Sequence, residues 1–101
     1  MKNLNQLMKQ AQQMQTRMAE LQRELAETPF TGEAGGVVSV TLNGAQELLA
    51  VKIAPAALAD GDAELLEDLI TAAFRAAQTA ARQASEEKLG GLTGGLGLPG
   101  L

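Results

Sequence analysis

The chain has 101 residues, which suits one small domain with a core thin enough that association with a second copy would help to stabilise it. It contains neither cysteine nor histidine, and this excludes disulfides, thiolate chemistry, histidine general bases and the common zinc sites. Its net charge of −4 argues weakly against nucleic-acid binding, but the charges are spread unevenly, and exposed charges act only over short distances.

The first predicted element is a long amphipathic helix that begins near Leu4. It ends before Pro29, because a proline disfavours the helical conformation of the residue that precedes it. Its apolar residues recur at alternating steps of three and four, which is the a/d spacing of a helix seam. These residues are Leu4, Leu7, Ala11, Met14, Met18, Leu21 and Leu25.

This seam needs a partner surface. The free energy that it costs to order the backbone of such a helix is at least as large as the free energy gained by burying the seam side chains. Two alternatives stay open. The seam packs within the chain, or it is shared between two copies. In the second case the sequence predicts a dimer interface made of Leu7, Ala11, Met14, Met18 and Leu21.

The face opposite the seam is polar and slightly basic. Residues 1–19 contain three cations and no acid, and Lys2, Lys9 and Arg23 fall in the row directly opposite the seam. Lysine, arginine, glutamine and threonine are side chains that contact phosphates and groove edges in nucleic acids. A face that is only solvated normally mixes both signs of charge, so both interpretations stay open, with nucleic-acid contact as the more specific one.

A change of period after this helix predicts a small antiparallel sheet. Apolar residues alternate with polar ones near 37–42 and again near 49–53, which indicates two strands. Asn43-Gly44 predicts a type I′ hairpin turn between them, and the break in alternation at Leu48 allows a bulge or a longer loop. Residues 30–33 are expected to add a short edge strand.

A second helix is predicted from about residue 63 to residue 88, with Asp62 as its N-cap. Arg75 and Arg82 lie in its acid-free segment 69–85 and repeat the basic pattern of the first helix. Residues 90–101 are rich in glycine and leucine and are expected to form a flexible tail, which leaves residues 1–89 as a single domain.

No constellation of residues in the sequence supports catalysis or metal binding. The acidic segment 60–64 is similar to the start of a calcium loop, but Leu65 and Thr71 stand where such a loop needs glycine and glutamate. We therefore expect no enzyme, no cofactor, no metal and no small-molecule substrate. The amino terminus lacks the apolar core of a signal peptide, and no apolar run is long enough to cross a bilayer. A cytoplasmic protein that contacts no membrane is expected.

Four stretches of the chain form a recognisable set, in order and with matching gaps. They are LMKQAQQMQ, TGEAGG with VVSVTLNG, VKIAP, and LLEDLITAAFRAA. Together they resemble the YbaB/EbfC family of bacterial nucleoid-associated proteins, and the resemblance covers roughly residues 4–85. It implies an α+β fold of order α-β-β-β-α, with a small antiparallel sheet between two long helices, that forms a tweezer-like homodimer. It also implies binding of double-stranded DNA with low sequence specificity, changes in DNA conformation, and roles in nucleoid organisation and gene expression.

Carried onto this chain, the resemblance places DNA contacts on both long helices. It points to Lys9 and Arg17 on the first helix and to Arg75 and Arg82 on the second. Lys2 and Arg23 lie at the margins of the matching segments and are the outer candidates. The alternative function, from another class, is a non-catalytic dimeric adaptor that holds a partner protein through its methionine-bearing helices. Retardation of duplex DNA at moderate salt separates the two hypotheses.

Overall fold

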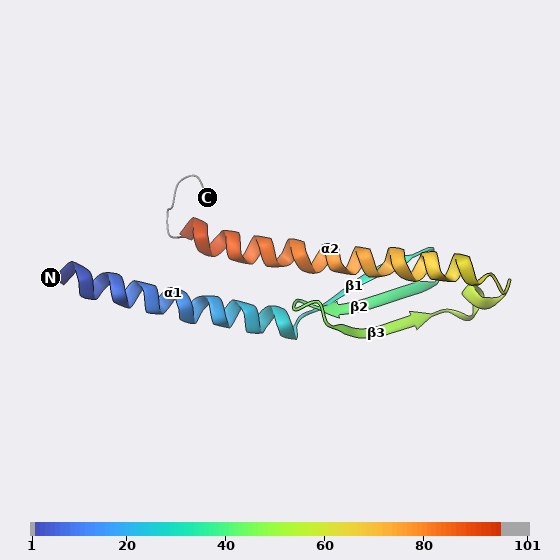
Figure 1. Ribbon diagram of the computed structural model, residues 1–101, viewed down its shortest axis with the longest axis horizontal. Coiled ribbons are helices and arrows are strands. Elements are labelled where there is room, and N and C mark those ends of the chain that lie inside the picture. Colours follow the sequence, from blue (N-terminus) through green and yellow to red (C-terminus); the bar gives the residue numbers. More distant parts are fainter. Residues whose placement is uncertain (1, 96–101) are drawn as a thin grey trace.

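The structure is a computed structural model that describes residues 2–95, with side chains placed for residues 3–91. Two long helices enclose three strands in chain order, which confirms the predicted α-β-β-β-α fold (Figure 1). The elements are α1 (Lys2–Glu27), β1 (Pro29–Ala34), β2 (Val38–Asn43), β3 (Leu48–Ile53), the short 3-10 helix η1 (Pro55–Leu58) and α2 (Ala63–Gly95). The strands form one antiparallel sheet in the order β1-β2-β3, with β2 in the centre.

The molecule is long and thin. Figure 1 shows α2 running beside the sheet over one part of its length and beside α1 over the rest. The principal extents are 73 × 25 × 16 Å, and the radius of gyration is 19.7 Å. A compact chain of this length would have a radius of gyration of roughly 13 Å. The shape therefore leaves many apolar side chains without cover inside a single chain.

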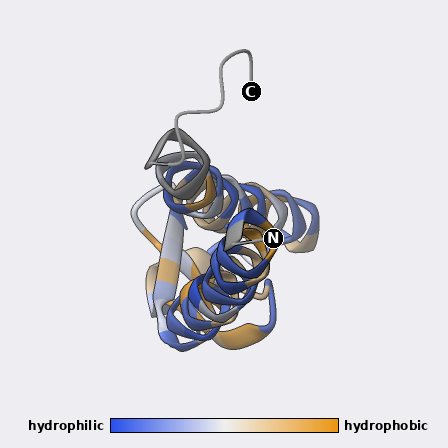
Figure 2. Ribbon diagram, turned by 90° about the vertical axis from the view of Figure 1, so that its left-hand side faces the viewer, coloured by the Kyte–Doolittle hydropathy of each residue, from blue (hydrophilic) through white to orange (hydrophobic). Residues whose placement is uncertain are grey.

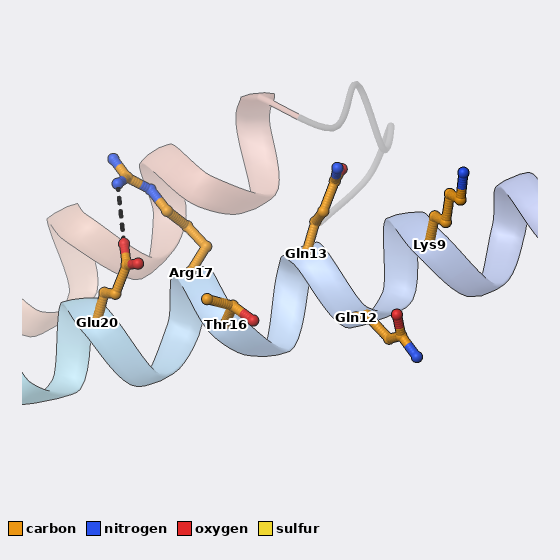
Figure 3. Close-up of a pocket in the computed structure, with 6 residues that line it drawn as sticks. All are labelled: Lys9, Gln12, Gln13, Thr16, Arg17 and Glu20. Carbon is orange, nitrogen blue, oxygen red and sulfur yellow. Dashed lines mark ion pairs between the residues drawn. The ribbon is translucent and has the colours of Figure 1, made fainter.

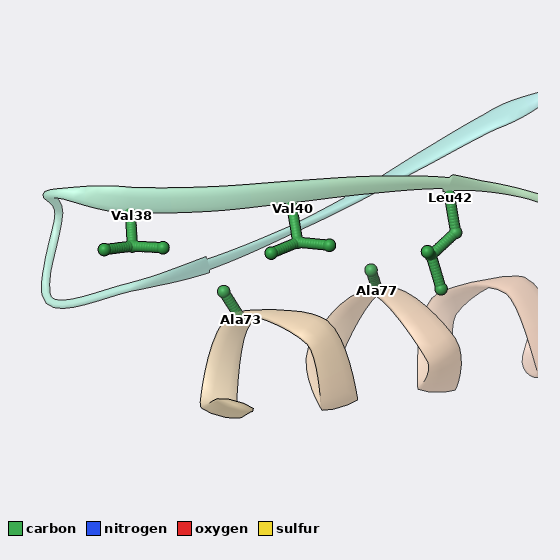
Figure 4. Packing of buried hydrophobic residues seen from close by; sticks show 5 residues of the cluster. All are labelled: Val38, Val40, Leu42, Ala73 and Ala77. Carbon is green, nitrogen blue, oxygen red and sulfur yellow. The ribbon is translucent and has the colours of Figure 1, made fainter. Parts of the chain in front are cut away.

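The main core lies where β2 packs against α2. It consists of Val38, Val40, Leu42, Ala73 and Ala77, all almost fully buried (Figure 4). The alanines let the helix approach the sheet closely, and β1 comes closer still at Gly32. A Cβ atom on Gly32 would lie 2.2 Å from the backbone oxygen of Ala73, so only glycine fits there. The result is a tight but small two-layer core.

Of the two hairpin connections, only the second differs from the expected arrangement. Between β1 and β2 the chain turns at Gly35-Gly36, with φ angles of 60° and 70°, and both central residues thus have the positive φ that a type I′ turn requires. The prediction of a type I′ turn at Asn43-Gly44 is wrong. The β2–β3 connection is a longer loop in which Gln46 adopts the positive φ, of 64°.

The Asn43 side chain explains the longer loop, because it takes over the hydrogen bonds that a tight turn would make. Its Oδ1 accepts the N–H groups of Ala45 and Glu47, each at 3.0 Å. Gly44 is needed for a different reason, which is contact with the end of α1. Its N–H donates to the Leu25 carbonyl at 2.8 Å, and a Cβ there would lie 2.3 Å from that oxygen.

Two further predictions concern the ends of elements. Asp62 caps α2 as expected, because its Oδ1 accepts the N–H of Leu65 at 3.0 Å. The helix continues to Gly95, past the predicted end at residue 88 and the predicted domain boundary at residue 89. Each glycine weakens a helix by about 1 kcal/mol but keeps its N–H donor, so the hydrogen-bond ladder is not interrupted. Residues 96–101 of the predicted tail lie outside the described residues.

The predicted irregularity in the last strand is confirmed. Thr41 pairs with Ala50, whereas its neighbour Leu42 pairs with Leu48, so Leu49 is the extra residue of a bulge. Beyond the bulge the register is regular as far as Ile53.

Candidate nucleic-acid interface

A polar stripe runs along the outer side of α1. Its residues lie three or four positions apart from their neighbours on one helix face and line a shallow depression of about 410 Å³ (Figure 3). They are Lys9, Gln12, Gln13, Thr16, Arg17 and Glu20. Figure 2 shows hydrophilic colour over most of this helix. Amide, hydroxyl and cationic side chains thus stand together on one exposed surface, and the stripe meets its first acid only at Glu20.

The two predicted cations of this stripe differ in their surroundings. The Arg17 guanidinium lies 3.6 Å from the Glu20 carboxylate, and both side chains are exposed. An exposed pair of this kind contributes about 0–1 kcal/mol, so a phosphate can displace the carboxylate at little cost. Lys9 has no carboxylate within ion-pair distance among the residues whose side chains are placed. Lys9 is therefore the more available cation of the stripe.

The outer predicted residues on α1 are less informative. Arg23 is exposed and lies seven residues after Thr16, so it continues the same row. The Lys2 side chain lies outside the described ones, although its backbone belongs to α1. The structure thus extends the stripe toward Arg23 and leaves Lys2 as a sequence prediction.

Arg75 and Arg82 form the second predicted group. Both are exposed, and neither lies within ion-pair distance of a carboxylate among residues 3–91. They are seven residues apart, which places their Cα atoms roughly 10 Å apart along the helix axis. The helical repeat turns them away from the buried Ala73 and Ala77, which face the sheet. These two arginines therefore form a basic row on the outside of α2.

The structure does not join the two basic groups into one site. α1 and α2 meet near the carboxyl end of α1, where an ion pair of 3.4 Å links Glu24 with Lys88. Lys88, which the sequence analysis did not single out, is thus engaged between the helices. One chain presents two separate basic rows, one on each long helix.

The α1 seam divides into a buried part and an open part. Leu21 is only 8% exposed and is buried together with Leu25 where α1 packs against α2 and β2. Met14 is half-buried, whereas the other three predicted interface residues, Leu7, Ala11 and Met18, are exposed. Of the seam residues, only Leu21 and Leu25 are thus buried within the chain, and the sharing of the others between two copies stays a prediction.

A second uncovered apolar surface lies on β3, and the sequence analysis did not identify it as an interface. Leu48, Val51 and Ile53 pair across the sheet with the buried Leu42, Val40 and Val38, so both sets share one face. α2 packs mainly against β1 and β2, and the three β3 side chains remain 56%, 42% and 37% exposed. We call these three residues the β3 face. The signal in the sequence was the segment LLAVKI, in which only Lys52 is polar.

Other kinds of site find no support in the described part of the chain. Among its side chains, no group of three or more histidine, cysteine, aspartate or glutamate residues could hold a metal ion. No helix in this part is both long and apolar enough to cross a membrane. The exposed basic rows remain the chemically distinctive feature.

The fold and these surfaces define a class: a small, elongated α+β protein that exposes basic polar helix faces of the kind that contacts nucleic acids. Residues 1–96 match the model of the YbaB/EbfC DNA-binding family. The chain belongs to this family. Membership confirms the prediction of a DNA-binding protein that is not an enzyme.

Individual relatives agree with this assignment. A nucleoid-associated protein of Paramagnetospirillum magneticum is 54% identical to the chain, over 98% of the chain and 94% of the relative. A nucleoid-associated protein of Roseiflexus sp. is 45% identical, over 97% of the chain and 98% of the relative. The crystal structure of an uncharacterized protein from Helicobacter pylori has the same fold, with a TM-score of 0.78. The match covers 88% of this chain and 95% of the Helicobacter pylori chain, and the two sequences are 23% identical, so the similarity supports the fold alone.

Proposed function

We propose that the protein binds double-stranded DNA as a homodimer with low sequence specificity. By changing the conformation of DNA in the nucleoid, it would affect nucleoid organisation and gene expression. The nucleoid association of its relatives supports this role. The observation that carries it is the polar stripe of α1, which is exposed and holds no acid before Glu20.

Electrostatic attraction to phosphates supplies the affinity in this proposal. Lys9, Arg75 and Arg82 are exposed without a carboxylate partner among the described side chains, and Arg17 has an exchangeable one. A homodimer doubles these four cations to eight. Contacts of this type hold the backbone but do not read sequence, which agrees with low specificity.

The homodimer is supported by the imbalance between buried and exposed apolar side chains. Among the described residues, eight hydrophobic side chains are buried, three of them alanines, whereas ten large ones are exposed. A core this small rarely supports a stable domain without association. A second copy would cover two surfaces. They are the β3 face and the open part of the α1 seam, which consists of Leu7, Ala11 and Met18.

The experiment that tests the proposal is a gel shift of duplex DNA at increasing salt, run beside a mass measurement in solution. If the dimer contacts about six phosphates, its affinity falls roughly 10³-fold between 50 and 200 mM salt. A nearly constant affinity over this range would remove the electrostatic mechanism. A dimer that fails to retard DNA at any salt would favour the adaptor function instead.

Charge-reversed variants test which face makes the contact. The double variant Lys9→Glu with Arg75→Glu is expected to lose the shift while its mass and helix content stay unchanged. Lys52→Glu is a control for a single charge reversal, because it makes the same change as Lys9→Glu but on β3, away from both helices. An unaltered shift in the double variant would reject the assignment of the two helix faces.

A further inference from the structure

We infer that α1 inserts into the major groove of DNA and that the side-chain amides of Gln12 and Gln13 form hydrogen bonds with adenine bases there. This inference rests on the proposed function and adds a source of sequence preference to it. The phosphate contacts alone provide none. The argument uses the shape of α1, the position of the two amides and the absence of competing acids.

The amino-terminal part of α1 is an exposed rod. Every residue from Asn3 to Gln13 is exposed, and the first buried side chain is Leu21. Figure 1 shows this end of α1 projecting past the carboxyl end of α2. An α-helix with its side chains is about 10–12 Å across, and the major groove of B-form DNA is about 12 Å wide. A helix of this width fits the groove, and the side of α1 that bears the polar stripe, opposite Leu7 and Ala11, stays accessible when a second copy covers these two residues.

The two glutamines lie where a groove-bound helix meets base edges. They flank the central row of Lys9 and Thr16 in the polar stripe, and Figure 3 shows them pointing to opposite sides of that row. A glutamine amide can both donate and accept, which matches the N6 amino group and N7 atom of adenine in the major groove. Both side chains are fully available, because neither amide has a hydrogen-bond partner among the described residues.

The charges around the amides favour this orientation. Lys9 and Arg17, on the same stripe, are placed to hold the phosphates that border the groove. No acid lies on α1 before Glu20, so the inserted part carries no charge that phosphates repel. Two amides read only a short stretch of bases, and a preference added to a strong phosphate term stays modest.

The experiment compares a preferred duplex, obtained by selection from random sequences, with the same duplex carrying 7-deazaadenine. This base keeps its pairing but lacks the N7 acceptor. The wild-type protein is expected to bind the preferred duplex about five-fold or more tightly than random DNA, the low end of the effect of one bidentate contact. It should lose most of this preference on the modified duplex.

Three variants separate base reading from backbone binding. Gln12→Ala with Gln13→Ala should bind the preferred duplex no more tightly than random DNA, and its affinity should not change when adenine is replaced by 7-deazaadenine. Lys9→Ala should weaken binding to all duplexes alike, and its affinity for the preferred duplex should still fall when adenine is replaced by 7-deazaadenine. Gln22→Ala, an exposed glutamine in the half of α1 that adjoins α2, should behave like the wild type.

The possible failures are distinguishable. If the wild type binds DNA without preference, or if 7-deazaadenine has no effect, base reading is overturned and the proposed function stands. If the double glutamine variant keeps its helix content but loses affinity for random DNA as strongly as for the preferred duplex, the amides bind the DNA backbone. The inference is again overturned in that case. If the wild type retards no duplex at all, both the inference and the proposed function fail.

Discussion

The sharpest test of the assembly is the substitution Val51→Lys in the β3 face. Val51 is 42% exposed in the single chain, and its pairing partner Val40 lies on the same face of the sheet but is covered by α2. In a single copy the new lysine would stand in water, and exposed substitutions of this kind change stability by no more than about 0.5 kcal/mol. In the proposed homodimer it would be buried. The two assemblies therefore predict different outcomes.

The size of the effect follows from the exposed fraction. Full burial of a valine is worth about 1.5–3 kcal/mol, so covering the open 42% of Val51 contributes roughly 0.6–1.3 kcal/mol. A two-fold symmetric interface counts each residue twice, which gives roughly 1.2–2.6 kcal/mol. Burial of an unpaired lysine adds a further cost of at least about 1 kcal/mol. The dissociation constant of the dimer is therefore expected to rise at least tenfold.

Sedimentation over a range of protein concentrations measures this change, with circular dichroism to show that the helices persist. Thr79→Lys is the matched control, because it adds the same charge on the exposed side of α2. The control should dimerise like the wild type. An unchanged dissociation constant for Val51→Lys would refute the placement of the β3 face in the interface. A loss of helix content in dilute Val51→Lys alone would show that the monomer does not fold, which also agrees with an obligate dimer.

Three further substitutions test how the fold is held together. Gly44→Ala would force a methyl group against the Leu25 carbonyl and break the contact of the hairpin with α1. The melting temperature of this variant should fall by several degrees. An unchanged melting curve would contradict the close approach of Gly44 to Leu25. Leu42→Ala opens a cavity in the core and should lower the free energy of unfolding by about 2–5 kcal/mol, as measured with a denaturant. A loss below about 1 kcal/mol would show that neighbouring side chains move to fill the cavity. Lys88→Ala removes an exposed ion pair with Glu24 and should cost less than about 1 kcal/mol at low salt, and a larger loss would mean that this pair holds the helices together.

The elements of the fold could be predicted from the sequence because their signals are local. The three-four spacing of the α1 seam predicts the helix and the side on which Leu21 and Leu25 become buried, and the alternation in β2 predicts the buried side of that strand. Asp62 was identified as a cap for the same reason, since the cap and the amide that it binds are three residues apart. These features depend on neighbours along the chain and not on the way that the elements pack.

The remaining features depend on contacts between distant segments. The type I′ turn was expected at Asn43-Gly44, but Gly44 serves to approach Leu25, some twenty residues earlier in the chain. The same holds for the β3 face, because alternation cannot reveal that α2 covers β2 and leaves β3 open. The division of the α1 seam at Leu21 likewise depends on where α2 ends beside it. Basic candidates were predictable by residue type, but not the ion pair that engages Lys88.

The acidic net charge is compatible with DNA binding because of where the acids lie. A cluster of five acids surrounds the start of α2, at the end of the molecule opposite the projecting end of α1 (Figure 1). They are Asp60, Asp62, Glu64, Glu67 and Asp68. The molecule is 73 Å long, whereas exposed charges are screened over about 8 Å at physiological salt, so this cluster does not weaken the field at Lys9. Among the acids outside this cluster, Glu20 and Glu24 are ion-paired with Arg17 and Lys88. In the proposed complex, repulsion at the acidic end would direct DNA toward the projecting helices, so the uneven charge would help to orient the protein on its ligand.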